Sequence, residues 1–105
     1  MGRVASKKFS LLYSGTSKNL IKKLHPQLKS IIKTKIEQIR ENPYLGKHLQ
    51  NELSGYLSFR ANRYRIIYKI DNDMNTVQIH YVGRRRDVYK LLGEQIKRKI
   101  AWKRP

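Results

Sequence analysis

Three consecutive arginines, Arg84, Arg85 and Arg86, follow Gly83, and Tyr89 follows them within the next helical turn. A guanidinium donates hydrogen bonds in a planar fork that matches phosphate oxygens, so several of them together suit a phosphate-binding site. Tyr89 comes three residues after Arg86 and four after Arg85, a spacing that places these side chains on one turn of a helix. The mutual repulsion of the arginines would be relieved by a bound anion.

A site of this kind can do chemistry on RNA. The 2′-hydroxyl of RNA can attack its own adjacent phosphate, and the protein then has to align the attack, move protons and neutralise the charged phosphorane. Clustered arginines neutralise that charge and also stabilise an ionised phenol, so Tyr89 can serve as a proton carrier. The spacing is equally consistent with a Tyr89 that only packs the last helix against a sheet.

The histidines give weaker signals. His25 precedes Pro26 and is expected to cap a helix, and His48 falls in a polar loop. His80 lies in an apolar strand, where a structural role is expected, although it could act as a base if it faced the arginines. Three histidines spaced this widely give no metal signature, and no glycine-rich phosphate loop is present. We therefore expect neither a metal nor a cofactor.

The charge balance predicts the class of partner. The chain has 105 residues, 24 Lys and Arg against 7 Asp and Glu, a formal net charge of +17, and no cysteine. This length fits a single domain over residues 1–105. Such a surplus of positive charge makes a polyanion or an acidic protein the expected partner. An evenly solvated basic surface and a membrane-binding helix are the alternatives, but no apolar run is long enough to span a membrane.

The elements that would position these groups follow from periodicity. Residues 7–14 are predicted to form a first strand, and Thr16 or Ser17 is predicted to cap a short helix. Pro26 suits the first turn of a second helix, which Pro43 ends. After a polar loop, three strands are predicted at 56–60, 63–70 and 76–82, the last two joined by a hairpin over "DNDMN". Beyond Gly83 the apolar spacing becomes helical again.

Alternation along the middle strand separates two faces. Its apolar face is predicted to hold Tyr64, Ile66, Tyr68 and Ile70, and its opposite face Arg63, Arg65, Ile67 and Lys69. On the preceding strand Leu57 and Phe59 match the apolar face, which leaves Tyr56, Ser58 and Arg60 on the arginine side. We expect Val77, Ile79 and Tyr81 to share one side of the last strand.

These elements predict an α+β fold with the order β-α-α-β-β-β. Two N-terminal helices are expected to pack on one face of a small antiparallel sheet, and a C-terminal helix follows the last strand. The other face of the sheet is predicted to be bare, with Arg60 and Arg65 on adjacent strands and the Arg84 to Arg86 run just past the end of the next.

Two segments resemble a known family. "RYRIIYKID" and "VGRRRDVYK" are similar to the RelE/ParE toxin superfamily of toxin–antitoxin systems, and the resemblance extends from about residue 8 to residue 92. It implies a RelE-like fold. RelE-type members are ribosome-dependent endoribonucleases that cut mRNA, whereas ParE-type members inhibit DNA gyrase. The resemblance places Arg65 and Arg85 at phosphate-stabilising positions and Tyr89 at the position of a tyrosine implicated in proton transfer or stacking.

The chain departs from the RelE pattern at three positions. Tyr56 and Ser58 stand where the best-known members have two lysines, and Arg84 stands where many have a histidine. An arginine stays protonated near neutral pH and is a poor proton acceptor. The general base is therefore unassigned, and Tyr56 becomes a candidate for stacking on an RNA base.

The sequence thus predicts the toxin of a type II toxin–antitoxin system, a metal-independent endoribonuclease that cuts mRNA on the ribosome. Arg65, Arg85 and Tyr89 are the expected catalytic residues. The expected RNA-binding residues are Tyr56, Arg60, Arg63, Arg84 and Arg86. We expect a cytoplasmic protein that forms a hetero-oligomer with an acidic antitoxin. A ParE-like gyrase inhibitor and a non-catalytic RNA-binding module are the alternatives.

Overall fold

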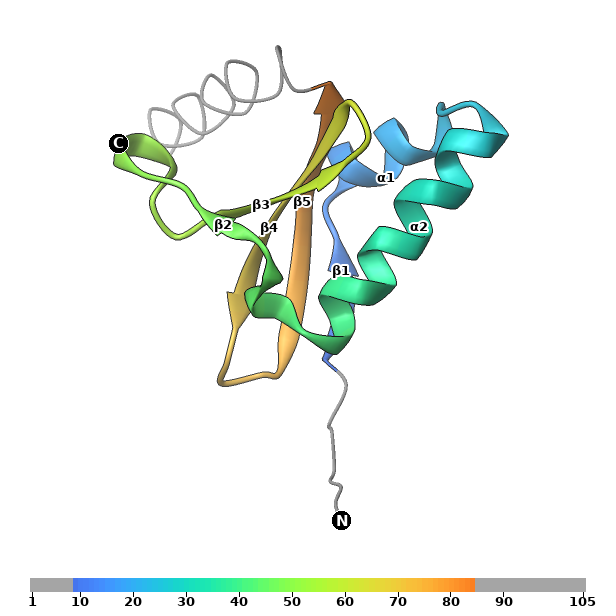
Figure 1. The fold of residues 1–105 in the computed structure, drawn as a ribbon. Helices are drawn as coiled ribbons and strands as arrows, with labels where there is room; N and C mark the ends of the chain where they lie inside the picture. Colours follow the sequence, from blue (N-terminus) through green and yellow to red (C-terminus); the bar gives the residue numbers. More distant parts are fainter. Residues whose placement is uncertain (1–8, 85–105) are drawn as a thin grey trace, which may run out of the picture.

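A five-stranded sheet forms the centre of the molecule (Figure 1). The computed structural model describes residues 9–84, so the predicted C-terminal helix lies outside the described residues. The strand order is β1-β5-β4-β3-β2, and the strands are β1 (Ser10–Tyr13), β2 (Lys47–His48), β3 (Leu57–Ala61), β4 (Tyr64–Asp71) and β5 (Thr76–Arg84).

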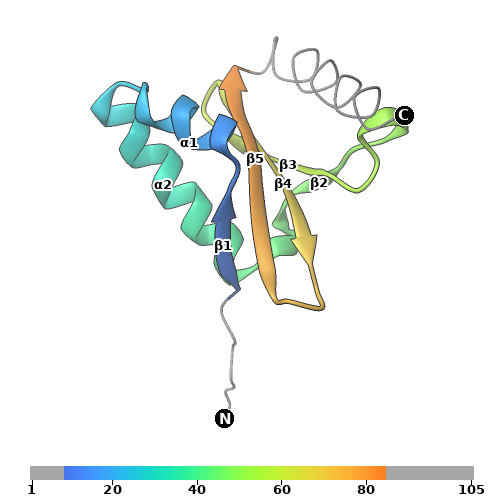
Figure 2. The same ribbon diagram turned by 180° about the vertical axis from the view of Figure 1, so that it is seen from behind.

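The sheet is mixed rather than antiparallel, which corrects the predicted pairing. β1 runs parallel to β5, with Ser10 opposite Thr76 and Tyr13 opposite Ile79. The other neighbouring pairs are antiparallel. Viewed from behind, β1 lies at one edge of the sheet beside β5 (Figure 2). The α+β fold class is confirmed, and periodicity could not give the direction of β1 because alternation is the same in parallel and antiparallel strands.

The first helix, α1 (Gly15–Lys22), begins earlier than predicted. Its cap is Ser14, whose hydroxyl accepts a hydrogen bond from the Ser17 N–H at 3.0 Å. Ser17 itself is buried, and its hydroxyl donates to the Ile79 carbonyl of β5 at 2.9 Å. The prediction of a cap at Thr16 or Ser17 is therefore wrong, and Ser17 instead ties the helix to the sheet.

The second helix, α2 (Pro26–Glu41), matches its prediction at both ends. The His25 side chain caps it by accepting from the Gln27 N–H at 3.3 Å, and Pro26 occupies the first turn. The helix ends just before Pro43, as expected of the residue that precedes a proline. Neither of the two α-helices within residues 9–84 is long and apolar enough to cross a membrane.

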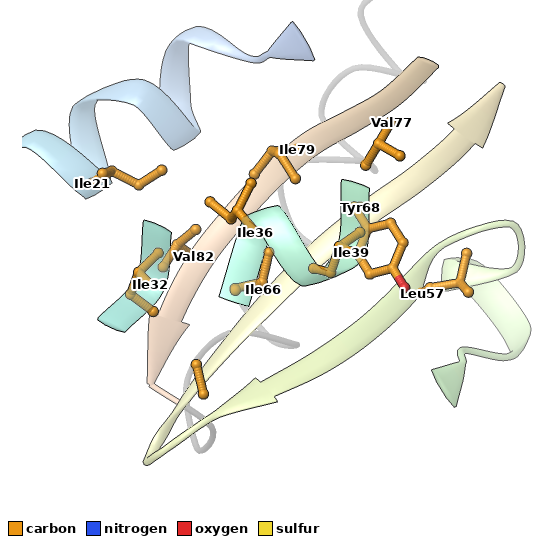
Figure 3. Packing of buried hydrophobic residues seen from close by; sticks show 11 residues of the cluster. Ile21, Ile32, Ile36, Ile39, Leu57, Ile66, Tyr68, Val77, Ile79 and Val82 are labelled. Carbon is orange, nitrogen blue, oxygen red and sulfur yellow. The ribbon is translucent and has the colours of Figure 1, made fainter. Parts of the chain in front are cut away.

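The main core lies between these helices and one face of the sheet, which we call the inner face (Figures 1 and 3). Helix α2 contributes Ile32, Ile36 and Ile39, all fully buried. From the sheet, the buried side chains are Leu57, Ala61, Ile66, Tyr68, Val77, Ile79 and Val82. The predicted apolar faces of β3 and β4 are confirmed. The opposite side of the sheet is the outer face.

Two hairpins join the antiparallel strands. Asn62 and Arg63 alone connect β3 to β4, and Asn62 has a φ of 58°. Residues 72–75 connect β4 to β5, as the "DNDMN" motif predicts, with Asn75 at a φ of 51°. Asparagine tolerates this left-handed region better than most residues. Because β4 begins at Tyr64, the prediction that Arg63 belongs to the strand is wrong.

The Tyr68 hydroxyl anchors the chain that leaves α2. This fully buried side chain donates to the Pro43 carbonyl at 2.7 Å and accepts from the Gly46 N–H at 3.0 Å. A short 3-10 helix, η1 (Pro43–Leu45), lies between these two contacts. A Cβ atom at Gly46 would collide with the Tyr68 hydroxyl, so glycine is required here for close approach.

We expect Gly46→Ala to lower the free energy of unfolding by about 2 kcal/mol, because the added methyl overpacks this contact and disturbs a buried hydrogen bond. Gly15→Ala is the matched control, since a Cβ there would meet nothing within 4 Å. It should change stability by less than about 0.5 kcal/mol. Urea unfolding followed by circular dichroism measures both, and equal effects of the two substitutions would contradict the close approach.

Burial raises the pKa of Tyr68 to about 12, although the hydrogen bond from Gly46 opposes part of the rise. In the unfolded chain the phenol ionises near pH 10. Between these values the folded state keeps a proton that the unfolded state has lost, so this tyrosine's contribution to stability falls as the pH rises.

The difference in unfolding free energy between the wild type and Tyr68→Phe should accordingly shrink by roughly 2 kcal/mol from pH 10 to pH 12. Phenylalanine lacks the titrating proton, so the lysines and arginines common to both proteins cancel in the comparison. A difference that stays constant across this range would show that Tyr68 ionises normally.

Candidate functional site

Two arginines lie side by side on the outer face. Arg60 of β3 is the partner of Arg65 on β4, and Arg65 is in turn opposite Gly83 of β5. We call Arg60 and Arg65 the arginine row. Their alternation with the inner-face residues puts both on the side away from α1 and α2, as predicted. Gly83 has no side chain, so β5 places none beside Arg65 in this row.

The guanidinium of Arg65 is only partly satisfied. Its Nη1 lies 3.5 Å from the hydroxyl of the buried Ser58, a long contact for a hydrogen bond. Its Nε is buried and has no hydrogen-bond partner within the part of the chain that the structure describes. An arginine keeps its charge at any relevant pH, and a buried donor without an acceptor costs about 1–3 kcal/mol or more. This arrangement favours a bound anion beside Arg65.

The remaining predicted arginines divide into three cases. Arg63 lies exposed in the β3–β4 turn, so it does not share a strand face with Arg65. Arg84 is the last residue of β5 rather than a residue beyond it, and it is opposite Tyr64, which packs against the main core. By register, Arg84 therefore belongs to the inner side at the end of the strand. Arg85 and Arg86 lie outside the described residues, as does Tyr89.

A second polar group on the outer face is formed by Tyr56, Lys69 and His80, which we call the Tyr56 cluster. The Lys69 ammonium nitrogen lies 4.8 Å from the centre of the Tyr56 ring, and the His80 ring meets Tyr56 edge to face at 5.2 Å. Burial raises the pKa of Tyr56, so its hydroxyl stays protonated near neutral pH. The sequence predicted only that Lys69 lies on the same strand face as Arg65, and it did not predict a role for Lys69 in a site.

Alternation with Val77 and Ile79 places His80 on the outer face, and an irregularity in β5 brings the next residue, Tyr81, to the same face. Ile67 is opposite Tyr81, but the next residue, Tyr68, is opposite Ile79, so β5 carries one extra residue, His80. A β-bulge of this kind reverses the alternation. Tyr81 consequently packs with Ile67 and not with the main core, contrary to the prediction that it shares a side with Val77 and Ile79.

The outer face is not as bare as predicted. Ile67 and Tyr81 form a buried apolar centre between the arginine row and the Tyr56 cluster, and Leu20 of α1 reaches this centre. Half-buried side chains pack on this centre from Leu20, Leu49, Leu53 and Tyr56. The loop before β3 therefore covers part of the surface, a role that its polar composition did not indicate.

Metal chemistry finds no support in the described part of the chain. No group of three or more His, Asp or Glu residues within residues 9–84 is arranged to hold a metal ion. The Nε2 atom of His80 lies 3.4 Å from the Gln78 side-chain oxygen, and His48 is exposed on β2. The polar groups of this surface are guanidinium, ammonium and aromatic groups, the kinds of group with which nucleic-acid-binding proteins contact phosphates and bases.

Comparison with known proteins gives consistent results. Residues 8–89 match the family model described as the ParE toxin of type II toxin–antitoxin system, parDE. The chain is 31% identical over 84 residues to Toxin RelG of Mycobacterium tuberculosis, which covers 78% of this chain and 97% of that toxin.

Solved structures show the same fold. The toxin–antitoxin complex RelBE2 from M. tuberculosis contains a chain with a TM-score of 0.68 and 28% identity, covering 75% of this chain and 100% of that one. The isolated E. coli RelE toxin superposes with a TM-score of 0.65 at 19% identity, over 84% of this chain and 98% of that one. The predicted RelE-like fold is confirmed.

Binding of a small anion can test the arginine row directly. We expect pyrophosphate at ten times its Kd to stabilise the wild-type protein by about 1.4 kcal/mol, which raises the Tm by several degrees. Arg65→Lys keeps the charge but lacks Nε and the planar fork, so its Tm shift should be much smaller. Differential scanning calorimetry measures both, and equal shifts would exclude a specific role for the Arg65 guanidinium.

Proposed function

Since this chain belongs to the family of ParE toxins of type II toxin–antitoxin systems, we propose that it acts as an endoribonuclease that cleaves mRNA on the ribosome and so stops translation. The observation that carries this proposal is the buried Nε of Arg65, which has no hydrogen-bond partner among residues 9–84 and stands in a row with Arg60 on the outer face. The named relatives RelG and RelE support the RelE-like side of the family.

The proposed reaction uses the RNA itself as the nucleophile. The 2′-hydroxyl loses its proton and attacks the adjacent phosphorus, forming the bond from O2′ to phosphorus as the bond from phosphorus to O5′ breaks. The products are a 2′,3′-cyclic phosphate and a 5′-hydroxyl. Because the nucleophile belongs to the substrate, the protein has to position the phosphate, stabilise charge and transfer two protons.

Each proposed catalytic residue has one task. The guanidiniums of Arg65 and Arg85 would bind the non-bridging oxygens, where charge increases in the phosphorane. Tyr89 would transfer a proton, in keeping with its position after the arginine run. Arg60, being exposed next to Arg65, would hold the flanking backbone. Arg63 and Arg86 are proposed to contact RNA further from the scissile phosphate, and Arg84, which by register belongs to the inner side, is proposed to reach RNA only around the end of β5.

The net charge of +17 also bears on partners. Ribosomal RNA offers a dense array of phosphates, so association with the ribosome would weaken steeply with added salt. An acidic antitoxin would neutralise the toxin in a hetero-oligomer, and the similarity to a chain of a solved toxin–antitoxin complex supports this partner. A cytoplasmic location follows from these targets.

One alternative function has an observation in its favour. The matching family model is named for ParE and not for RelE, and the ParE-type members that the sequence resembles inhibit DNA gyrase. In that case the basic surface would bind a protein or DNA, and this chain would cleave no bond. Messages that stay intact in cells with an early DNA-damage response would favour gyrase inhibition, whereas cuts within codons would favour the ribonuclease.

Cleavage of mRNA on purified ribosomes tests the proposed residues. We expect Arg65→Ala, Arg85→Ala and Tyr89→Phe each to lower the cleavage rate by about 10²-fold, because each removes charge stabilisation or proton transfer. Lys22→Ala, which removes one exposed charge from α1, is the control and should retain near wild-type cleavage. If all three site variants cleave as fast as Lys22→Ala, the proposed mechanism is wrong.

A further inference from the structure

The Tyr56 cluster lies on the same side of the sheet as the arginine row and at a fixed separation from it. Lys69 follows Arg65 by four residues along β4, so their Cα atoms are about 13 Å apart on the same face. Between them lie Ser58, Ile67 and Tyr81, all buried. The outer face thus carries two separate cationic positions, and a single-stranded segment that joins them passes over Leu49 and Leu53, which pack on the centre between them.

A hollow of about 480 Å³ adjoins the cluster. It is lined by Lys69, Ile70, Asp71, Asn72, Asp73 and Gln78. Lys69 belongs both to the Tyr56 cluster and to the lining of the hollow, and its cross-strand partner Gln78 also lines the hollow. The hollow is therefore directly next to the cluster. Its carboxylates repel phosphate, but its carboxylate and amide oxygens accept hydrogen bonds from the amino groups of bases. The charges therefore favour a phosphate near Lys69 and a base toward the hollow.

The aromatic groups of the cluster suit a base. Tyr56 and His80 are both half-buried and meet edge to face, an arrangement that fixes the two rings relative to each other. Stacking on aromatic rings is a common way for proteins to hold single-stranded nucleic acid, and a nearby cation adds attraction for the backbone. The Lys69 ammonium lies over the Tyr56 ring, and Tyr56 packs on Ile67 and Tyr81, so a base that contacts this ring would take the place of the ammonium, which then becomes available to a phosphate.

We propose that the Tyr56 cluster and this hollow form a second nucleotide subsite, in which Lys69 binds a backbone phosphate of single-stranded RNA and Tyr56 and His80 contact the neighbouring base. The proposal rests on the proposed function, because the phosphate held at Arg65 is the anchor from which the strand reaches Lys69. The subsite makes Lys69 and His80 determinants of which nucleotides flank the cut.

A binding assay separates this subsite from the arginine row. The probes are a fluorescent hexanucleotide with 2′-O-methyl groups, which cannot be cleaved because its nucleophile is blocked, and adenosine 3′-monophosphate, which carries one phosphate. We expect Lys69→Gln to weaken hexanucleotide binding five- to tenfold, to reduce the salt slope by about 0.7 as expected for one phosphate contact, and to leave mononucleotide binding at Arg65 unchanged. Lys22→Gln, the control for net charge, should keep the wild-type slope.

The ring is tested by a matched pair of substitutions. Tyr56→Leu should weaken hexanucleotide binding by about tenfold, whereas Tyr56→Phe should retain it because stacking needs only the ring. If Tyr56→Leu does not fold, Lys69→Gln and its salt slope decide alone. A purely structural Lys69 would change the Tm but not the salt slope.

The outcomes also distinguish this inference from the proposed function. If Arg65→Ala weakens binding of both probes while Lys69→Gln behaves like Lys22→Gln, the second subsite is wrong and the proposed function stands. If none of these variants differs from the wild type, or the wild type fails to bind the hexanucleotide at low salt, the second subsite is wrong, and cleavage on purified ribosomes decides the proposed function separately.

Discussion

The alternation of β4 is the constraint on which the rest of the structure depends. This strand is hydrogen-bonded on both edges, to β3 and to β5, and its Ile66 and Tyr68 are fully buried against the helices. A shift of register by one residue would turn Arg65 and Lys69 toward the core, at the cost of burying two cations. The same apolar contacts that fold the protein therefore hold these cations on the outer face.

Arg65 carries a charge that the described part of this strongly basic chain does not compensate. Within the described residues, Arg40 forms an ion pair with Glu37 at 3.5 Å, but Arg65 has only the long contact to Ser58 and a buried, unpartnered Nε. The Arg65 guanidinium is partly desolvated without hydrogen bonds that compensate for the lost water, and this lowers the free energy of unfolding. Water, an ion or a ligand can complete a buried donor of this kind.

The sequence predicted the features that repeat with a regular period and missed those that interrupt it. Alternation identified the inner face of β4 and the Arg60–Arg65 side, and helical spacing with Pro26 and Pro43 gave both ends of α2. Local rules of this kind need only a few neighbouring residues. The placement of Arg60 and Arg65 on one face could therefore be predicted from the sequence alone.

What could not be predicted depends on contacts between distant segments. The bulge at His80 leaves no mark on the sequence, because one extra residue in β5 is detectable only against its partner strand. The cap of α1 is Ser14 and not the predicted Thr16 or Ser17, and the Ser17 hydroxyl instead donates a hydrogen bond to β5. The cover that Leu49 and Leu53 provide over Ile67 is likewise a tertiary contact.

The phenol of Tyr68 links the two sides of the sheet. By holding Pro43 and Gly46, it sets where the chain leaves the helical layer and enters the segment that carries Leu49 and Leu53 across the opposite surface. The Tyr68 hydroxyl thereby holds both ends of the Pro43–Gly46 connection in place. Insertions there would disturb the outer face of the sheet even though they fall beside the main core, so this short stretch should tolerate far less variation in length than the hairpin tips.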